Sequence, residues 1–513
     1  MAVDAVRSDG RAGGGSKVAW SCLVDDTPQI WSSITPWLAT AVGLAGIDPT
    51  RMYVHHVCPL RPEVASLCAA LGVNVVAVPA FDARSPHSNK IRQCQGDYGD
   101  ADRVALTDVD IVFARDVPLA TITAPVAGKL VDGPNPPVAV LERIFAEAGM
   151  AVPARFACGS WNAQSQRIAF ETVGGNFNGG LYVVDAPLLA ALGARWAHWA
   201  HWLLDRVELL DKWRVHVDQV SFCLALAEAG KAFQILSDAW NFPTHRPVDT
   251  SADEPILLHH HGRLDAHMRL QQVDAPQARP AIARVNRTIE QFQRRYFDNR
   301  GFWNHRYAHH PALGSGQGSR GEILERKRAL LAALIPRELS VLDWGCGDLE
   351  TTRDLPCRDY VGVDLSIEAL RIAAAKQPSW TFATPADFDA GVDHRRDVVL
   401  CLDVLIHQPD PAAYRALVGR LLGRARRGAL VSGFDRDPGI GSHITYFHEP
   451  LSRTIAAMPG VAAMVPLLEY RDTTLYFVAV GDEPMTPADG EAAQAFARRV
   501  LSGTLPDQQE GPA

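Results

Sequence analysis

The stretch that most constrains the fold is Val341–Asp348, which reads V-L-D-W-G-C-G-D. A short apolar run beginning at Leu339 ends here in a glycine-rich turn, and a helix-like stretch follows. In a strand–turn–helix arrangement of this kind the backbone can approach a nucleotide-like ligand closely, because glycine carries no side chain. A second apolar strand ends at Asp364, where a carboxylate can hold two ribose hydroxyls. The two features together predict a nucleoside-binding site.

The size and composition of the chain limit the classes of protein it can belong to. Its 513 residues are too many for one ordinary domain, so two or three domains are expected. A net charge of −8 argues against a nucleic-acid-binding surface, and we expect no nucleic-acid partner. The nine cysteines are odd in number and form no CxxC pair, which indicates free thiols in a reducing compartment and a cytoplasmic protein.

The domain boundaries follow from changes in composition along the chain. Residues 1–16 contain a G-G-G-S run and no apolar stretch, so a disordered leader without a signal peptide is expected. No apolar run reaches 18 residues, so no membrane span is expected. We expect a first domain over 17–280, a connecting helix over 281–300, a second domain over 301–482, and a C-terminal helix and tail over 483–513.

The first half of the chain alternates apolar strands with amphipathic helices. This alternation predicts an α/β domain with a mostly parallel sheet and helices on both faces. The expected strands are Lys17–Val24, Met52–Val57, Asn74–Val78 and Arg103–Leu106, and the expected helices are Trp31–Leu44 and Pro62–Leu71.

Asp108 and Asp110 come directly after the strand that ends at Leu106. The carboxyl ends of strands form the ligand-binding edge of an α/β sheet. Two carboxylates there suit a hard divalent cation, such as Mn²⁺ or Mg²⁺, which can bridge phosphate oxygens. A solvated acidic turn is the alternative interpretation.

The order of motifs over residues 17–270 resembles nucleotide-sugar-dependent glycosyltransferases of the A-type fold, especially family eight. The resemblance implies a nucleotide-sugar donor and a divalent cation. It implies the following roles: donor phosphates on Lys90, metal on Asp108, Asp110 and His259, the sugar pocket at Asn178 and Gly179, and the transferred sugar facing Asp218, as a catalytic residue, and Gln219. The lysine–proline–tryptophan continuation of family eight is missing after Gly262, where R-L-D follows.

Structural explanations compete with these assignments. The run His259–His261 can form an exposed polar turn. Asn178–Gly180 can make a tight turn before a strand, and Asp218 can cap a helix over Gln219–Gly230. Three tryptophans at near-helical spacing are expected in the core and not in a sugar platform: Trp196, Trp199 and Trp202.

The second half predicts another α/β domain, ending in an antiparallel hairpin whose strands flank a short R-D-T link. Residues 301–321 have the glycine and serine density of a linker, yet they carry Trp303, Arg306, Tyr307 and Arg320, which a passive linker does not need. The expected helices are Glu322–Leu334, Ser366–Lys376 (capped by its serine) and Ala412–Leu422, and the expected later strands are Trp380–Ala383, Arg396–Gln408, Gly428–Phe434, Val465–Tyr470 and Thr474–Val480.

Residues 300–482 resemble class I S-adenosylmethionine-dependent methyltransferases, a Rossmann-like fold. The resemblance implies S-adenosyl-L-methionine as cofactor. Its implied contacts are Asp343, Gly345 and Gly347 in the first loop, Asp364 on the ribose, Leu365, Asp387 and Phe388 at the adenine, Asp403 after the fourth strand, and Tyr307 and Arg320 in a covering segment. A dinucleotide dehydrogenase would need a third glycine where Glu350 stands, and that side chain would obstruct the pyrophosphate.

Methyl transfer to a hydroxyl requires in-line positioning and removal of a proton. His407, just past the fourth strand, is the first candidate base; the alternative is a loop histidine that only forms hydrogen bonds. His443 and Tyr446, after the fifth strand, are candidates for binding the acceptor. This half has no carboxylate–histidine spacing typical of a metal site, so metal-independent transfer is expected.

The sequence thus favours a bifunctional enzyme that transfers a sugar from a nucleotide sugar and O-methylates a sugar hydroxyl on a glycan or glycosylated metabolite. One alternative is a methyltransferase whose first domain is a catalytically silent sugar-binding or docking module. Another is methylation of a protein or of a small molecule that is not a sugar.

Overall fold

The structure is a computed structural model that describes residues 17–25, 27–161, 167–245, 254–273, 275–296, 298–391, 394–436 and 444–502. The chain divides into two compact units, Met1–Ile289 and Glu290–Ala513. The division falls within helix α6 (Arg279–Arg295), inside the region where the sequence predicts a connecting helix. No helix in the described parts of the chain is long and apolar enough to cross a membrane.

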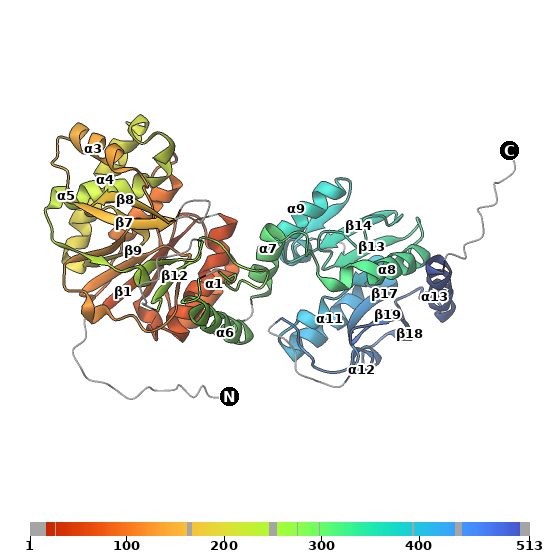
Figure 1. Ribbon diagram of the computed structural model, residues 1–513. Coiled ribbons are helices and arrows are strands. Elements are labelled where there is room, and N and C mark those ends of the chain that lie inside the picture. The colour runs from red at the N-terminus through yellow and green to blue at the C-terminus, as the bar shows by residue number, and fades with distance from the viewer. Residues whose placement is uncertain are drawn as a thin grey trace, which may run out of the picture. The chain divides into compact units, whose positions relative to one another are not determined.

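A seven-stranded mixed sheet organises the first unit, in the order β10-β6-β9-β4-β1-β2-β3 (Figure 1). Strands β1, β2, β3 and β4 run parallel, whereas β9 is antiparallel to both β4 and β6. The strands are β1 (Val18–Val24), β2 (Met52–His56), β3 (Asn74–Ala77), β4 (Arg103–Thr107), β6 (Val126–Leu130), β9 (Phe177–Asp185) and β10 (Phe233–Leu236). The predicted α/β class is confirmed.

The helices of the first unit lie near their predicted positions where the sequence allowed a prediction. They are α1 (Pro28–Gly43), α2 (Pro62–Leu71), α3 (Val138–Glu147), α4 (Ala186–Leu204) and α5 (Val217–Ala229), and a two-stranded ribbon adds β7 (Arg155–Trp161) and β8 (Arg167–Val173). Gly72 ends α2 in a left-handed conformation, which suits glycine.

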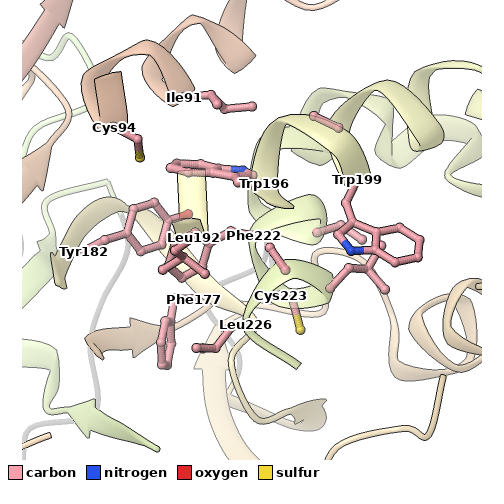
Figure 2. Packing of buried hydrophobic residues seen from close by; sticks show 14 of the residues in the cluster. Ile91, Cys94, Phe177, Tyr182, Leu192, Trp196, Trp199, Phe222, Cys223 and Leu226 are labelled. Atoms are coloured by element: carbon pink, nitrogen blue, oxygen red, sulfur yellow. The ribbon is translucent and has the colours of Figure 1, made fainter. Parts of the chain in front are cut away.

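The core between α4, α5 and the sheet is aromatic (Figure 2). Trp196 is fully buried and meets Phe222 edge-on, with ring centroids 4.9 Å apart. Tyr182 of β9 stacks on Phe222 at 4.1 Å. Each such side chain contributes roughly 1.5–3 kcal/mol by leaving water. Trp199 is also buried and Trp202 packs against the same cluster, so the predicted core role of the three tryptophans is confirmed.

A small second sheet lies in the first unit, formed by β11 (Phe242–Pro243), β12 (Leu257–His259) and β5 (Ile111–Phe113). Strand β12 is antiparallel to β5, and its register pairs His259 with Ile111. The backbone N–H of His260 donates to the carbonyl of Asp110 at 3.0 Å. This pairing brings the histidine run beside the acidic pair, although about 150 residues separate them in the sequence.

The second unit contains a seven-stranded sheet in the order β15-β14-β13-β16-β17-β19-β18 (Figure 1). Its first five strands are parallel, and β19 is antiparallel to β17 and β18, which confirms the predicted terminal hairpin. The strands are β13 (Ser340–Trp344), β14 (Asp359–Val363), β15 (Thr381–Ala383), β16 (Arg396–Cys401), β17 (Ala425–Phe434), β18 (Val461–Tyr470) and β19 (Thr473–Val480).

Helices pack on both faces of this sheet over two apolar clusters. They are α7 (Asn299–His309), α8 (Gly321–Leu334), α9 (Ile367–Lys376), α10 (Pro385–Asp389), α11 (Pro411–Arg424), α12 (Leu451–Ala456) and α13 (Pro487–Leu501). The Ser366 side chain caps α9 by accepting from the N–H of Ala369, as the sequence predicts. The linker interpretation of residues 301–321 is wrong for their first part, because Asn299–His309 form helix α7, which the Asp298 side chain caps. The glycines and serines follow this helix.

Candidate active sites

The first candidate site lies where β4 ends and the small sheet begins. Single ligand atoms of Asp108, Asp110 and His259 all lie within 4.8 Å of one another. The His259 Nε2 atom is 3.1 Å from the Asp110 carboxylate. Two carboxylate oxygens and one imidazole nitrogen are ligands that Mn²⁺ accepts, so the three residues predicted from sequence fit a divalent cation.

The His259 ring is held by a chain of amide side chains. Its Nδ1–H donates to the Asn241 Oδ1 atom at 3.0 Å, and its Nε2 atom points at Asp110, where it donates to the carboxylate when protonated and offers a lone pair to a cation when neutral. The Asn241 amide donates to Asn178 Oδ1 at 2.9 Å, and the Asn178 amide donates to Asp132 at 2.6 Å. Sequence reasoning missed Asn241 and Asp132, because no motif marks them and they reach the site from separate segments.

Lys90 supplies a buried positive charge to the same site. Its ammonium is 2.6 Å from Asp108 and 3.3 Å from Asp218, and it donates to the carbonyl of Gly179 at 3.3 Å. Lys90 comes from the 3₁₀ segment Pro86–Gln95, whereas Asp218 lies in the first turn of α5. Three of the predicted residues therefore meet around the Lys90 ammonium group.

Electrostatics distinguish the two carboxylates of the acidic pair. Burial raises the pKa of Asp108, and repulsion from Asp110 adds to this effect although Lys90 opposes it. Burial also acts to raise the pKa of Asp110, but the charge and hydrogen bond of His259 outweigh it, so that the pKa of Asp110 falls below its usual range. A bound cation would favour the ionised form of both groups.

The site opens into a pocket of about 750 Å³. Its lining includes the predicted residues Lys90, Asp108, Asp110, Asn178, Gly179, Asp218, Gln219 and His259, together with Asp132, His216, His245 and His261. A volume of this size suits a ligand as large as a nucleotide sugar.

The alternative structural explanations fail at this site. His259 and His260 are buried, so the histidine run is not an exposed turn. Asn178–Gly180 lie within strand β9. The N-cap of α5 is His216, and the Asp218 carboxylate contacts Lys90 in place of capping.

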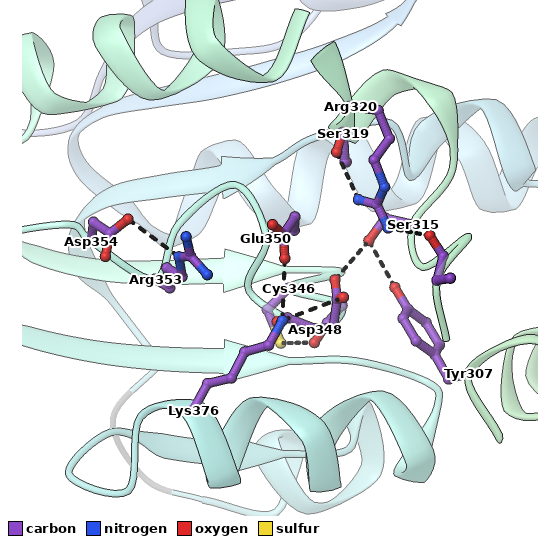
Figure 3. A network of polar contacts seen from close by, with 12 residues as sticks. Tyr307, Ser315, Ser319, Arg320, Cys346, Asp348, Glu350, Arg353, Asp354 and Lys376 are labelled. Atoms are coloured by element: carbon purple, nitrogen blue, oxygen red, sulfur yellow. Dashed lines mark hydrogen bonds and ion pairs between the residues drawn. The ribbon is translucent and has the colours of Figure 1, made fainter. Parts of the chain in front are cut away.

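The second candidate site surrounds the glycine-rich turn after β13. Gly345 and Gly347 have φ values of +81° and +54°, a region that favours glycine. A Cβ atom at Gly347 would lie 2.6 Å from Ser315 Oγ and Tyr307 Oη, so the covering segment packs directly on the turn. Figure 3 shows this contact region, where the Tyr307 hydroxyl and Ser315 Oγ are 2.7 Å apart.

Glu350 lines the second pocket and pairs with a cation of the protein. The Lys376 ammonium donates to the Asp348 carbonyl at 2.7 Å and to the Glu350 carboxylate at 3.2 Å (Figure 3). Burial acts to raise the pKa of Glu350, but the hydrogen bond and charge of Lys376 lower it below its usual value. The residue in the place of a third glycine thus anchors the turn to α9.

Two buried carboxylates flank the turn. Asp364, after β14, accepts the N–H of Gly347 at 2.9 Å and the N–H of Ser366 at 2.8 Å. Asp343 accepts the hydroxyls of Tyr360 at 2.5 Å and Thr352 at 3.1 Å. Burial raises the pKa of both carboxyl groups to about 6.

Asp403 is held by protein groups on both of its oxygens. One oxygen is 2.6 Å from the fully buried Lys327 ammonium, and the other accepts from Ser432 at 3.0 Å and Tyr470 at 2.5 Å. Asp403 also has a φ of +61°. The network shapes the turn that leads to His407, and sequence reasoning missed Lys327, which is 76 residues away.

His407 faces the pocket with a fixed tautomer. Its Nδ1–H donates to the carbonyl of Ile444 at 2.5 Å, so Nε2 carries the lone pair that a general base requires. The Trp303 ring meets it edge-on at 5.1 Å. Burial lowers the pKa of His407, which favours the neutral imidazole.

These groups line a pocket of about 210 Å³. The predicted residues in its lining are Tyr307, Asp343, Gly345, Gly347, Asp364, Leu365, Asp403 and His407.

The other described residues predicted for this half lie outside that lining. Arg320 donates to the carbonyls of Ser319 and Ala312. The Asp387 carboxylate accepts from Thr384 at 2.6 Å, and Phe388 is buried in the core. The Tyr446 backbone N–H donates to Ile406, whereas His443 lies outside the described residues.

Comparison with known families supports the assignment of the first unit. Residues 39–230 match the family model of the Rhodobacterales glycosyltransferase domain, which confirms the resemblance to glycosyltransferases. This match includes Lys90, Asp108, Asp110 and Asp218 but ends before His259. None of the curated proteins compared with the chain matches it.

Several solved structures are similar to parts of the chain. The galactosyltransferase LgtC, with donor and acceptor sugar analogues, is 14% identical over 52% of this chain and 95% of its own, with a TM-score of 0.35. Mouse xyloside xylosyltransferase 1 is 13% identical over 48% of this chain and 98% of its own, with a TM-score of 0.31. The N-methyltransferase NodS from Bradyrhizobium japonicum WM9, with S-adenosylhomocysteine, is 13% identical over 31% of this chain and 88% of its own, at 0.25. Because these TM-scores are low, the fold assignment rests on the order of the strands in the two seven-stranded sheets.

Proposed function

We propose that the protein is a bifunctional transferase. The first unit transfers a sugar from a nucleotide sugar with the help of Mn²⁺ or Mg²⁺, and the second transfers a methyl group from S-adenosylmethionine to a sugar hydroxyl on a glycan or glycosylated metabolite. The observation that supports it most strongly is the convergence of Asp108, Asp110 and His259 from two distant segments in a domain of glycosyltransferase type.

In the first reaction, Asp108, Asp110 and His259 would hold the cation, which neutralises the diphosphate leaving group. Lys90 lies beside this site and adds a second positive charge that donor phosphates can use. Asp218 and Gln219 line the same pocket and would face the sugar. Their carboxylate and amide groups can orient its hydroxyls for in-line attack by the acceptor.

In the second reaction, the cofactor supplies an electrophilic methyl group on its sulfonium. Asp364 would accept the ribose hydroxyls. At Gly345 and Gly347 the missing side chains leave room for Val404 and for the covering segment at Tyr307 and Ser315, which line the same pocket. His407 would take the proton of the acceptor hydroxyl at Nε2, since its Nδ1–H is already donated. Trp303 shields this position on one side.

One observation favours a second candidate function. The Lys90 ammonium already neutralises Asp108, as expected of a first unit that binds sugars without a cation. In that case the first unit would be a catalytically silent module that delivers acceptors to the methyltransferase.

Release of nucleoside diphosphate separates the two candidates. Purified full-length protein is incubated with a panel of nucleotide sugars and either Mn²⁺ or EDTA, and the products are analysed by mass spectrometry. We expect at least one donor to be cleaved with Mn²⁺ only. No cleavage of any donor, with intact binding of S-adenosylmethionine by calorimetry, would favour the silent module.

A further inference from the structure

Lys327 of α8 is a fully buried lysine that contacts both the covering segment and the turn after β16. Its ammonium donates to the carbonyl of Gly318 at 2.8 Å and to the Asp403 carboxylate at 2.6 Å, and it lies 4.5 Å from the centroid of the Tyr470 ring. Lysine is almost never fully buried unless it is paired. One ammonium group therefore joins the covering segment, at Gly318, to the strand end at Asp403.

The stability of the fold is a poor explanation for this buried pair. Desolvation of an ammonium and a carboxylate offsets most of their attraction, and apolar side chains of similar volume are often equally stabilising. Leu324 and Leu331 of the same helix are buried with apolar side chains, so an apolar residue would suit α8 at this position too. The place of the pair beside the pocket points instead to a role in the site.

Asp403 holds a turn that reaches both the glycine-rich turn and His407. Its φ of +61° is an uncommon and strained conformation for a residue other than glycine. Val404 packs on the glycine-rich turn, because a Cβ atom at Gly345 would clash with its Cγ2 atom. The N–H of His407 donates to the Val404 carbonyl at 3.0 Å. The position of His407 thus depends on how Asp403 is held.

The covering segment contacts the same turn at two points. A Cβ atom at Gly318 would clash with the Asp403 carboxylate, so the backbone of the segment lies directly on this group. At the start of α7, the Asn299 amide donates to the carbonyl of His407 at 2.8 Å and accepts from the Trp303 indole N–H at 3.0 Å. The placement of the covering segment and that of the His407 turn are therefore coupled.

We propose that Lys327 is a positioning residue for methyl transfer, which clamps the covering segment onto the turn that carries His407. This inference rests on the proposed methyltransferase function and deepens it. The lining of the pocket does not include Lys327, so the lysine acts through Gly318 and Asp403. Burial acts to raise the pKa of Asp403, but the charge and hydrogen bond of Lys327 lower it below its usual value, which keeps the pair ionised.

A pair that serves stability alone is the competing explanation, and a double variant separates the two. Lys327→Met by itself leaves the Asp403 carboxylate buried without its cation, which is strongly destabilising. Lys327→Met combined with Asp403→Asn removes both charges and should recover most of the thermal stability, but it does not restore the ammonium between Gly318 and the turn. Arg326→Met, at the exposed neighbouring position of α8, is the matched control.

The test combines fluorine NMR and calorimetry on the full-length protein labelled with fluorotryptophan. Trp303 meets His407 edge-on, so its signal, assigned with Trp303→Phe, reports the contact between the covering segment and the turn. In the double variant we expect a shifted or broadened Trp303 signal at a nearly native Tm. We also expect about tenfold weaker binding of S-adenosylhomocysteine, as for loss of a hydrogen bond from a charged group. Arg326→Met should match the unmodified protein in all three measurements.

Three results would overturn the assignment. A native Trp303 signal and native affinity in the double variant would show that the pair is only structural. A Tm that falls as far in the double variant as in Lys327→Met would assign the lysine to the packing of α8. If the unmodified protein does not bind S-adenosylhomocysteine, the methyltransferase function fails and the positioning role fails with it, whereas the first two results leave that function standing.

Discussion

The carboxylates proposed to meet the ligands are held in different ways in the two sites. In the first unit, Asp108 faces the Lys90 ammonium and Asp110 faces the His259 ring. In the second unit, Asp343 and Asp364 beside the glycine-rich turn accept from hydroxyls and backbone N–H groups, whereas Asp403 pairs with the Lys327 ammonium. A pair of carboxylates balanced by charged or ionisable groups can exchange those partners for a metal cation. Carboxylates satisfied by neutral donors are suited instead to recognise hydroxyls.

The largest expected effect is the loss of donor cleavage when one residue of the acidic pair is removed. Asp108→Ala or Asp110→Ala removes a cation ligand, and we expect Mn²⁺-dependent donor cleavage to fall by about a thousandfold, as several kcal/mol of leaving-group stabilisation is lost. The measurement is nucleoside diphosphate release. Asp116→Ala, an exposed acidic residue just beyond β5, is the control and should retain activity. Unchanged activity in both site variants would refute the metal assignment.

The next largest effect is expected from His407. His407→Ala removes the proposed base, so the kcat of methyl transfer should fall by about a hundredfold or more. The affinity for S-adenosylhomocysteine should stay within about twofold. Steady-state kinetics and calorimetry on the same preparation give both values. If affinity and kcat fall together, His407 acts on the shape of the pocket and not on the proton.

Removal of the proposed ribose contact should have a moderate effect. Asp364→Ala deletes the acceptor of two ligand hydroxyls, and we expect about thirtyfold weaker S-adenosylhomocysteine binding. Asp354→Ala, an exposed aspartate of the same unit, provides the comparison and should bind normally. A variant at Asp364 that binds as tightly as the control would remove the nucleoside site from this strand end.

The smallest expected effect is a pH dependence confined to the second site. Because the pKa of Asp364 is about 6, its protonated form predominates below that pH and accepts ligand hydroxyls less well. Calorimetry should show S-adenosylhomocysteine affinity falling by up to about tenfold per pH unit below 6. In Asp364→Asn, the affinity for S-adenosylhomocysteine should depend less steeply on pH below 6. An unchanged pH dependence would assign the titration to another group.

The same raised pKa values predict a trend in stability. Asp343 and Asp364 titrate near 6 in the folded protein and near 3.8 as free groups. Between about pH 4 and 6 the folded state thus binds more protons than the unfolded state, and their contribution to the free energy of unfolding decreases as the pH rises. Chemical denaturation of Asp343→Asn at several pH values should show a free energy of unfolding that decreases less steeply with rising pH than in the unmodified protein. The same decrease in both proteins would contradict the raised pKa of Asp343.

Much of the fold could be predicted from sequence because local patterns were strong. The apolar strands, the serine cap of α9 and the terminal hairpin follow from periodicity and turn residues. Helix α7 was not predicted, because the glycine-rich stretch after it gave the whole segment the composition of a linker. The candidate metal ligands could be predicted because Asp108 and Asp110 mark a strand end and a family motif adds His259.

The remaining parts of the sites depend on tertiary packing. Asn241 and Asp132 join the site only through side-chain hydrogen bonds. The Lys327–Asp403 pair joins a helix to a strand end 76 residues away, so no local pattern indicates it. The predicted adenine contacts at Asp387 and Phe388 match a motif, yet Thr384 and core packing take up these side chains.

The central claim is that one chain carries a cation-dependent sugar-nucleotide site and a separate cofactor site that needs no cation. The most direct test titrates the full-length protein with a set of nucleoside diphosphates and with S-adenosylhomocysteine, each in Mn²⁺ and in EDTA. We predict that at least one nucleotide binds only with Mn²⁺ and is lost in Asp110→Ala, while S-adenosylhomocysteine binds equally in both conditions. Nucleotide binding indifferent to Mn²⁺, or S-adenosylhomocysteine binding abolished by EDTA, would contradict the account.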